Sequence, residues 1–357
     1  MKRAFYCIKL PIQGGLHLGN GVDSFERSQD LWQSDAIKSA LYASLNYLCG
    51  IETPSGTEFF SSFKISSAFP YSENRLFFPI PRFADVQWAD VPEVERIKYR
   101  KKRKKLQWID QDLFEQTLHA RPIHISESKL LKGSYASVNA FRMEAELPFA
   151  EELMERVTLS RTPVEGKLST PFYFRKLRFG RNCGLFFLLE TQFDQTWLER
   201  YVFPALRLLG DEGIGSDRSA GGAWFDFNPK DHCNTIHLDV PDSSLFWMGM
   251  GNFAPTLDYW DKVDEKLSSW LWEKRGGYIA SPSNPQAMNL RKKSVYMLKT
   301  GSILASSIVP EGRLFDLSPN LEHLPEEKKS ALNHPIWRDA APIFLPIKPV
   351  VRQTIQR

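Results

Sequence analysis

The sequence predicts a mixed α+β fold, because strand patterns alternate with two amphipathic helix patterns along its first 228 residues. Residues 4–10 and 183–190 are predicted strands, and the second of them reads as fully buried. Residues 33–48 and 195–210 carry apolar side chains at helical spacing, which indicates helices with one buried face. The 357 residues are enough for two domains of ordinary size.

The first predicted helix has signals at both of its ends. Ser34 is the expected N-cap, and Gly50 is the expected stop. Its expected buried stripe consists of Ala36, Ile37, Ala40, Leu41, Ser44, Leu45 and Leu48. The second predicted helix contains Pro204, which is expected to kink it. Another strand, near residue 76, is broken by prolines, and an extended pattern resumes at 222–227.

This order of strand, helix, strand, strand, helix and strand is that of a ferredoxin-like (RRM-like) unit. A second, looser copy is predicted from strands at 244–251, 294–304 and 342–347, with a helix within 257–272, the first part of which is either helix or loop. The chain is therefore interpreted as two ferredoxin-like domains with inserted hairpins. The predicted ranges are 1–228, with an insertion at about 81–182, and 229–357. The insertion includes a short predicted helix near 110–119 and an alternating segment at 135–147.

Charge is unevenly distributed, although the net charge is only +4. Residues 98–105 read KYRKKRKK, with seven bases in eight positions. This block is either a solvated surface or a contact for a polyanion. Trp88, Tyr99 and Trp108 lie nearby in the sequence, and aromatic side chains among bases favour nucleic acid over a lipid surface.

The sequence shows no pattern of a membrane span, a signal peptide or a metal site. No run of eighteen apolar residues is present, and Lys9 and Pro11 interrupt the apolar N-terminus, so a cytoplasmic location is expected. The four cysteines form no C-x-x-C pair. His232, Cys233 and His237 lie together, but no fourth zinc ligand is evident, so neither a metal nor another cofactor is predicted.

Residues 209–222, LGDEGIGSDRSAGG, hold five glycines and one arginine. Ser216 and Asp217 stand where a P-loop needs lysine and Ser/Thr, and Arg218 replaces the third glycine of a dinucleotide fingerprint. The segment nevertheless suits a phosphate diester, because glycines let the backbone come close and Arg218 offers a forked donor. Asp211, Glu212 and Asp217 oppose an anion, and a glycine turn without a ligand is the alternative.

His17 lies among glycines in GGLHLGNG and has two interpretations. In one, it acts as general base on an RNA 2′-hydroxyl. In the other, it hydrogen-bonds its own loop or a backbone phosphate.

Several stretches, taken in order, resemble one family. LHLGNG at 16–21 precedes QSDAIKSAL at 33–41, and the later matching stretches are TLSRTPVEGKL at 158–168, LGDEGIGSDRSAGGAWF at 209–225, LKTGSIL at 298–304 and HPIWRDAAPIFLPI at 334–347. The glycine-rich stretch resembles the loop of RAMP proteins, the RNA-binding superfamily of CRISPR systems. The order and spacing of all the stretches resemble the Csm-type fourth subunits of type III-A CRISPR effector complexes.

The resemblance implies two ferredoxin-like domains and a non-catalytic, RNA-binding role in antiviral defence. It implies that the chain grips the 5′ handle of the CRISPR RNA and contacts both the large polymerase-like subunit and a RAMP backbone subunit, and so indirectly the target RNA. A protruding hairpin of the family wedges into RNA. The sequence agrees that the chain is not the target nuclease, since it has neither a Gly-Gly-Asp-Asp nor a His-Asp nuclease motif.

The resemblance also assigns candidate RNA-binding residues. They are Gly213, Gly215, Arg218, Ser219, Gly221 and Gly222 in the glycine loop, Arg161 in the central segment, and His17, Ser34 and Lys38 near the N-terminus. Asp35 matches the same pattern and is expected to be structural. Lys101, Lys102 and Arg103 are added on charge alone. The alternative function is a RAMP endoribonuclease that cuts repeat RNA with His17 as general base.

Overall fold

The structure is a computed structural model of the whole chain, and most of its residues can be described. The exceptions are residues 20–27, 29–30, 51–52, 90–95, 143, 158–170, 280–286, 288–289, 321, 323–331, 333 and 350–357, together with the side chains of 96–100. The mixed α+β class is confirmed. No helix in the described part of the chain is long and apolar enough to span a membrane.

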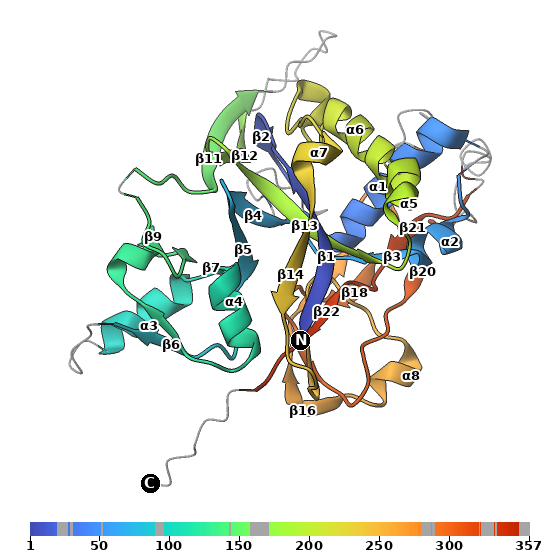
Figure 1. Cartoon of the computed structure of the whole chain (residues 1–357). Coiled ribbons are helices and arrows are strands. Elements are labelled where there is room, and N and C mark those ends of the chain that lie inside the picture. Colours follow the sequence, from blue (N-terminus) through green and yellow to red (C-terminus); the bar gives the residue numbers. More distant parts are fainter. Residues whose placement is uncertain are drawn as a thin grey trace.

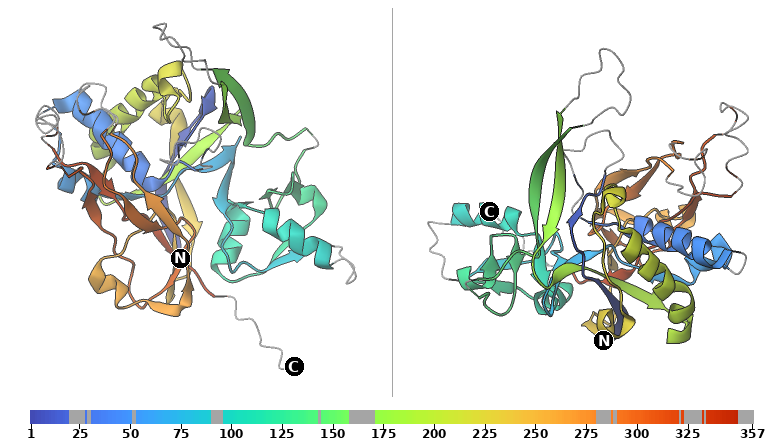
Figure 2. Two further views of the ribbon diagram at one scale, coloured as in Figure 1. Left: turned by 180° about the vertical axis from the view of Figure 1, so that it is seen from behind. Right: turned by 90° about the horizontal axis from the view of Figure 1, so that it is seen from above.

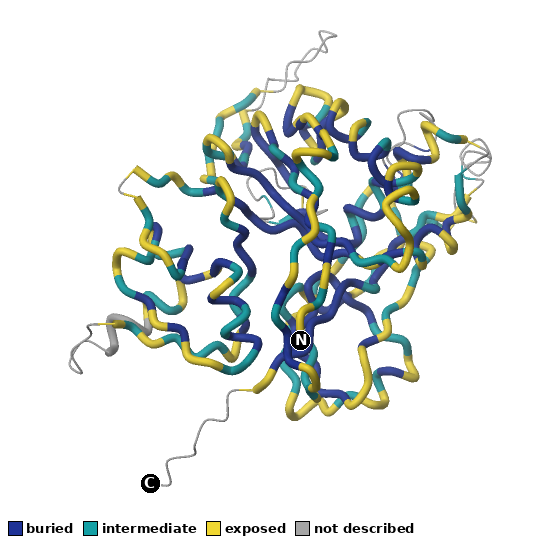
Figure 3. Tube along the Cα trace, viewed as in Figure 1, coloured by how far each residue is buried: buried dark blue, intermediate teal, exposed yellow. Residues whose placement is uncertain are grey.

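A large sheet forms the centre of the molecule (Figure 1). Its strands follow the order β14-β1-β13-β4-β5-β7-β10-β9, and β3 also pairs with β13. The strands are β14 (Cys233–Asp239), β1 (Lys2–Leu10), β13 (Cys183–Thr191), β4 (Phe69–Ser72), β5 (Arg75–Pro79), β7 (Trp108–Asp110), β10 (Tyr135–Ala136), β9 (Leu130–Leu131) and β3 (Phe63–Ile65). The predicted strands at 4–10, 76 and 183–190 are confirmed, and β13 is buried over most of its length (Figure 3).

Two helices cover one face of the sheet. They are α1 (Ser34–Cys49) and α6 (Phe203–Glu212), which contact each other. Ile37, Leu41 and Leu45 of α1 are fully buried against the sheet, because the spacing of three and four residues places them on one side of the helix. The predicted stripe is wrong at Leu48, which is 47% exposed. Gly50 ends the helix as predicted, with φ of 55°.

The predicted N-cap of α1 is wrong. Gln33 occupies the cap position, and its side chain makes no capping bond. The Ser34 hydroxyl instead accepts a hydrogen bond from the backbone N–H of Asn252, 3.1 Å away in the C-terminal half of the chain. A long-range contact has therefore replaced the local cap.

The segment before the glycine loop is helical, as predicted, but it is not one regular helix. A short α5 (Gln195–Trp197) leads into a π-helical turn, η4 (Leu198–Val202), and then into α6. Pro204 lies in the first turn of α6 and cannot donate to the turn before it, so the widened turn absorbs the irregularity.

The strand expected at 222–227 does not form. Its backbone groups bond to three separate places, because Gln13 donates to Trp224, Ile214 donates to Ala223, and Phe225 donates to Gly210. The strand forms later, as β14, after the short α7 (Pro229–His232). β14 pairs along β1, with Lys2 opposite Asp239. The first sheet therefore extends beyond the predicted boundary at residue 228.

The insertion forms a side lobe and a hairpin. The predicted helix near 110–119 is confirmed as α4 (Gln111–Leu118), and the lobe also contains α3 (Arg96–Lys105), η3 (Glu127–Lys129), β6 (Val86–Trp88) and β8 (Ile123–Ile125). The alternating segment at 135–147 is a strand only at β10. Beyond it, Ser137 and the Val138 N–H both donate to the Asp110 carboxylate, which turns the chain away.

The hairpin consists of β11 (Phe149–Val157) and β12 (Pro171–Phe179). It stands out from the body of the molecule (Figure 2). Near its base, β12 pairs with the short β2 (Gly15–Leu16), where Leu177 lies opposite Leu16.

The C-terminal half contains a second sheet, of order β16-β19-β15-β22. Its strands are β16 (Asp264–Ser269), β19 (Ile303–Ala305), β15 (Phe246–Gly249) and β22 (Phe344–Pro346), and two further pairs are β17 (Trp272–Arg275) with β18 (Val295–Leu298) and β20 (Leu314–Asp316) with β21 (Trp337–Asp339). Met248, Ile303 and Leu345 from this sheet share a core with the face of the central sheet opposite α1. The two halves therefore pack directly on each other.

Two predictions in this half are corrected. The helix at 257–272 is helical only at α8 (Leu257–Trp260), because the rest pairs with β19 and β18 as β16 and β17. The strand at 294–304 is split into β18 and β19 by a turn at Gly301, whose φ is 84°. The ferredoxin-like assignment of the two halves stays a prediction at this point.

Candidate nucleic-acid interface

The first residues of the glycine-rich segment, 209–212, are the end of α6, and the rest, 213–222, packs against the chain around His17. Gly213 and Gly215 have φ values of 75° and 84°, which side chains rarely adopt. A Cβ atom at Gly215 would lie 2.4 Å from the backbone oxygen of His17, and one at Gly213 would lie 2.4 Å from that of Gly222. These glycines are therefore needed for close packing within the protein itself.

His17 is not on the surface, since only 2% of it is exposed. Its Nδ1 lies 2.6 Å from the backbone oxygen of Arg175, and its ring packs at a tilt against Phe174 with centroids 4.4 Å apart. Its own backbone oxygen accepts the N–H of Ser216. Because the ring is buried, its assignment as a direct RNA contact is corrected, and it is poorly placed to act as a general base. Its hydrogen bond goes to β12 and not to its own loop.

The contacts of Asp217 explain why this acid stands in the loop. It is 7% exposed, and its two oxygens accept from the two terminal nitrogens of Arg156 at 2.8 and 2.9 Å. The Lys176 ammonium lies 3.3 Å from the same carboxylate. The hydrogen bond from Arg156, with help from Lys176, holds the pKa of Asp217 below its usual value. The other two acids, Asp211 and Glu212, are exposed at the end of α6.

The next three residues form the short η5 (Arg218–Ala220) at the surface of the loop. Arg218 is half-buried, while Ser219 and Gly221 are exposed. Among the residues that the structure describes, none forms a hydrogen bond or ion pair with the Arg218 guanidinium. Of the candidates in the loop, Gly213 and Gly222 are buried and Gly215 is half-buried.

A cleft of about 420 Å³ lies beside this surface. Its lining includes Gln13 and Gly14 from the loop after β1, and Arg178 and Arg181 from the base of the hairpin. A Cβ atom on Gly14 would lie 3.5 Å from the Gly221 oxygen, so the cleft borders the glycine loop. Arg178 and Arg181 are exposed and were missed by sequence reasoning, although the run RKLRFGR at 175–181 was a visible signal.

Ser34 and Lys38 belong to the junction between the two halves, and their assignment as RNA contacts is corrected. Lys38 is 1% exposed. Its ammonium donates to the Asp339 carboxylate at 2.7 Å and to the backbone oxygens of Phe60 and Phe63. Burial lowers the pKa of Lys38 and raises that of Asp339, while the ion pair opposes both changes.

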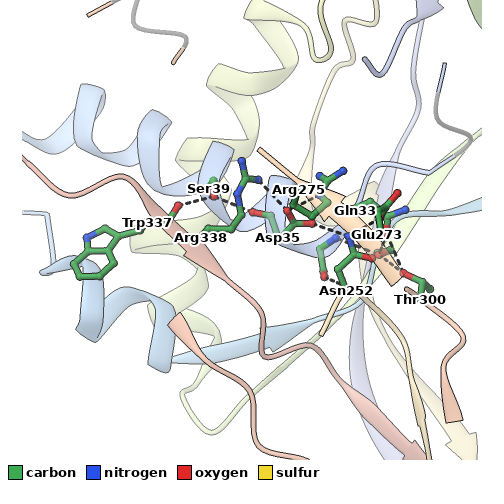
Figure 4. A network of polar contacts seen from close by, with 11 residues as sticks. Gln33, Asp35, Ser39, Asn252, Glu273, Arg275, Thr300, Trp337 and Arg338 are labelled. Atoms are coloured by element: carbon green, nitrogen blue, oxygen red, sulfur yellow. Dashed lines mark hydrogen bonds and ion pairs between the residues drawn. The ribbon is translucent and has the colours of Figure 1, made fainter. Parts of the chain in front are cut away.

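Asp35 is structural, as expected. It is fully buried and accepts from Arg275 of β17 and Arg338 of β21, each at 3.0 Å (Figure 4). Burial alone would raise the pKa of Asp35, but the two guanidinium groups outweigh it and the pKa is lowered. We call Asp35, Lys38, Arg275, Arg338 and Asp339 the junction cluster.

The basic block lies on α3, on the outer side of the insertion lobe and away from α6 (Figure 1). Lys101, Lys104 and Lys105 are exposed. Lys102 forms an ion pair with Glu127, and Arg103 is partly buried with its guanidinium 3.5 Å from the Pro81 oxygen. Trp108 cannot stack on bases there, because it is 5% exposed and packs in the core.

The candidate zinc ligands do not come together in the structure. The His232 Nδ1 accepts the backbone N–H of Asn228, and burial raises the pKa of Cys233 to about 11. His237 lies further along β14 and is exposed. Within the described residues, no group of three or more His, Cys, Asp or Glu side chains could hold a metal ion.

Comparison with known proteins connects this arrangement to one family. Residues 242–347 match the model of the CRISPR Csm4 C-terminal domain. A Csm4 protein of Thermococcus onnurineus is 27% identical over 236 residues, which cover 65% of this chain and 69% of that protein. A Csm4 protein of Methanocaldococcus jannaschii is 20% identical over 96% of this chain and 97% of its own length. The chain is therefore similar to Csm4 proteins along most of its length.

Solved structures of Csm4 have the same fold. A Csm1–Csm4 cassette in complex with cA4 contains a chain with TM-score 0.59 and 20% identity, covering 97% of this chain and 98% of that chain. A Csm3–Csm4 subcomplex of the type III-A interference complex gives TM-score 0.58 and 15% identity, covering 97% of this chain and all of that one. The resemblance to Csm4 predicted from the sequence is therefore confirmed.

Proposed function

We propose that this chain is a non-catalytic RNA-binding subunit of a type III-A CRISPR RNA-guided complex that acts in antiviral defence. It grips the 5′ handle of the CRISPR RNA and links the large polymerase-like subunit to the backbone subunits. The relation to Csm4 along almost the whole chain supports this role, because solved Csm4 chains occur with Csm1 in one assembly and with Csm3 in another.

The observation that carries the RNA-binding part is the surface beside the glycine loop. Arg218, Ser219 and Gly221 reach this surface, and the cleft next to them is lined by Arg178 and Arg181. Guanidinium groups pair with phosphate through two parallel hydrogen bonds, so such a surface suits an RNA backbone. Contacts of this type fix the position of the RNA without reading its sequence.

The hairpin supplies a second kind of contact. Leu153, Val157 and Tyr173 are each about half exposed on β11 and β12. Apolar and aromatic side chains on a protruding element can pack against unstacked bases. Arg161, the candidate from the central segment, lies outside the described residues, and its contact with RNA stays a prediction.

The order of the strands supports the ferredoxin-like assignment of both halves. In the central sheet, the last strand of the unit (β14) lies beside the first (β1), and the third (β13) lies between the first and the second (β3 and β4). The second sheet repeats this order with β22, β15, β19 and β16. The burial of His17 supports the non-catalytic role over the endoribonuclease.

Replacing Arg218 by Ala tests the proposed RNA contact. Loss of one charge-assisted phosphate contact is expected to weaken binding of RNA that carries the repeat-derived 5′ handle by roughly 1–3 kcal/mol. The matched control is Arg121→Ala, an exposed arginine on the insertion lobe, which should leave the affinity unchanged. Fluorescence anisotropy at physiological salt measures both variants, and equal affinities for Arg218→Ala and the native chain would contradict the proposal.

A further inference from the structure

The two faces of the hairpin have different surroundings. The strand register places Arg156 opposite Phe172, and Met154 opposite Phe174, so these residues lie on one face together with Lys176. Arg156, Phe174 and Lys176 face the body of the protein and are at most partly exposed, whereas the other face carries the exposed Leu153, Val157 and Tyr173. The first face is the one that meets the glycine loop.

Asp217 is the point where the hairpin and the loop are joined. Its carboxylate holds Arg156 of β11 and Lys176 of β12, one from each strand. The Arg156 guanidinium also lies 4.0 Å from the ring centroid of Phe174, and that ring packs against His17. We call Asp217, Arg156 and Lys176 the loop clamp.

The backbone of the loop is held at the same place from the other side. Ser216 donates its N–H to the backbone oxygen of His17, and Gly222 donates its N–H to that of Asp217. Arg218 directly follows Ser216 and Asp217, whose backbone groups are held by these bonds. The position of Arg218 therefore depends on both the loop backbone and the hairpin.

A local role for Asp217 is not what the geometry shows. An aspartate before a short helical turn commonly uses its carboxylate to cap that turn. Asp217 precedes η5 but makes no side-chain capping bond. Both of its oxygens bond instead to strands that are distant in the sequence.

We propose that Asp217 is a positioning residue, whose ion pairs with Arg156 and Lys176 set the angle between the β11–β12 hairpin and the glycine loop. This inference rests on the proposed function and deepens it. Arg218 and the hairpin then meet one RNA strand at a fixed separation. The handle is held in one register because the clamp keeps the two contact points from moving independently.

The hairpin is long enough that a small rotation at its base would shift the residues further out by several ångströms. β12 pairs with β2 at Arg178. Arg156 lies opposite Phe172, which is six residues from Arg178 along β12. Six residues of a strand span about 20 Å. If the hairpin rotates by roughly 15° about its pairing with β2, Arg156 is displaced by about 5 Å. That displacement exceeds the spacing of about 3.4 Å between nucleotides of a helical strand.

The test compares Asp217→Asn with Glu151→Gln in the full-length chain. Glu151 is the matched control, because it pairs with Arg175 on the same hairpin, and neither residue belongs to the loop clamp or lines the cleft. Spin labels on Glu155→Cys and Asp211→Cys, both exposed, report the distance from the hairpin to the end of α6. The partly exposed Cys49 and Cys233 are changed to serine in this background.

Asp217→Asn is expected to broaden the distance distribution and to weaken binding of the 5′-handle RNA about tenfold, the equivalent of one charge-assisted contact. Glu151→Gln should change neither quantity. Because an unfolded variant would also lose binding, circular dichroism must show native secondary structure, and Arg156→Lys, which keeps the charge, should restore most of the affinity that Arg156→Ala loses.

The possible outcomes separate this inference from the proposed function. If Arg218→Ala weakens RNA binding and Asp217→Asn changes neither distance nor affinity, the role of Asp217 is wrong and the RNA interface stands. If the distance broadens while the RNA affinity is unchanged, the clamp does not position the RNA contacts and the inference is wrong. If neither Arg218→Ala nor Asp217→Asn affects RNA binding, the proposed function itself fails at this surface.

Discussion

Asp35 and Asp217 are two carboxylates that are each held by two basic side chains, yet their surroundings differ. Asp35 is fully buried between the two halves of the chain, and the side chains of Arg275 and Arg338 are only 12% and 8% exposed. Asp217 lies at the edge of the body, and its partner Arg156 has a side chain that is 28% exposed. The same chemistry therefore serves a fixed junction in one place and a joint near the surface in the other.

The difference predicts different energies. A buried ion pair whose partner is removed leaves a charge without compensation, whereas water can reach a partly exposed pair and replace some of its bonds. The junction cluster should therefore govern the stability of the whole chain. The loop clamp should govern mainly the local arrangement around Arg218.

Replacing Asp35 by Asn is expected to have the largest effect. Arg275 and Arg338 would lose their shared counter-ion in a buried place, which costs about 3–5 kcal/mol of unfolding free energy. Denaturant unfolding followed by circular dichroism measures this. Asp226→Asn changes an exposed aspartate and should stay within about 0.5 kcal/mol of the native chain. If both variants unfold at the same denaturant concentration, the junction cluster does not make the expected contribution to the stability of the chain.

A matched pair of glycine variants tests the loop, with an intermediate effect. Gly215→Ala combines a positive φ with a Cβ that meets the His17 oxygen, so a loss of about 2–4 kcal/mol is expected. Gly221→Ala has a similar φ but open space around the Cβ, so roughly 1–2 kcal/mol is expected. Thermal unfolding of the two variants compares them. A Gly221 variant as damaged as the Gly215 variant would show that backbone conformation alone, and not the contact with His17, sets the cost.

The exposed lysines of α3 should have the smallest effect on stability. Replacing Lys101, Lys104 and Lys105 by Ala leaves the unfolding free energy within about 0.5 kcal/mol, because all three are exposed. If they touch RNA, the slope of log affinity against log salt should fall in magnitude by about 2, at about 0.7 per lost phosphate contact. Lys262→Ala with Lys266→Ala is the control on the other half of the chain. A salt slope equal to that of the control would leave the block as a solvated surface.

The sequence predicted the elements whose pattern is local. Ile37, Leu41 and Leu45 recur at helical spacing, and the apolar run of β13 needs no partner to be recognised. Residues 257–272 were mispredicted because pairing with strands distant in the chain outweighed their helical pattern. At 222–227 the backbone bonds to Gln13, far away in the sequence, and to Gly210 and Ile214 in and before the glycine loop, so no regular strand forms.

For the site as well, residues in a local pattern could be predicted, and residues placed by long-range contacts could not. Arg218 could be predicted because glycines and one arginine within fourteen residues form a local pattern. Lys38 was misassigned because its burial depends on Asp339, which lies 301 residues further along the chain. The acid at position 217 was unexplained by the sequence, since Arg156 and Lys176 are brought to it only by the fold.

The link between Lys38 and Asp339 has a consequence for how the chain is made. At about 5–20 residues per second, α1 leaves the ribosome well before β21 has been synthesised. Until then the Lys38 ammonium has no counter-ion to be buried with, and β1 also waits for β14 at its edge. A chain that stops before Asp339 cannot complete its junction, so chains shortened by translation errors are expected to be less stable than the full-length protein.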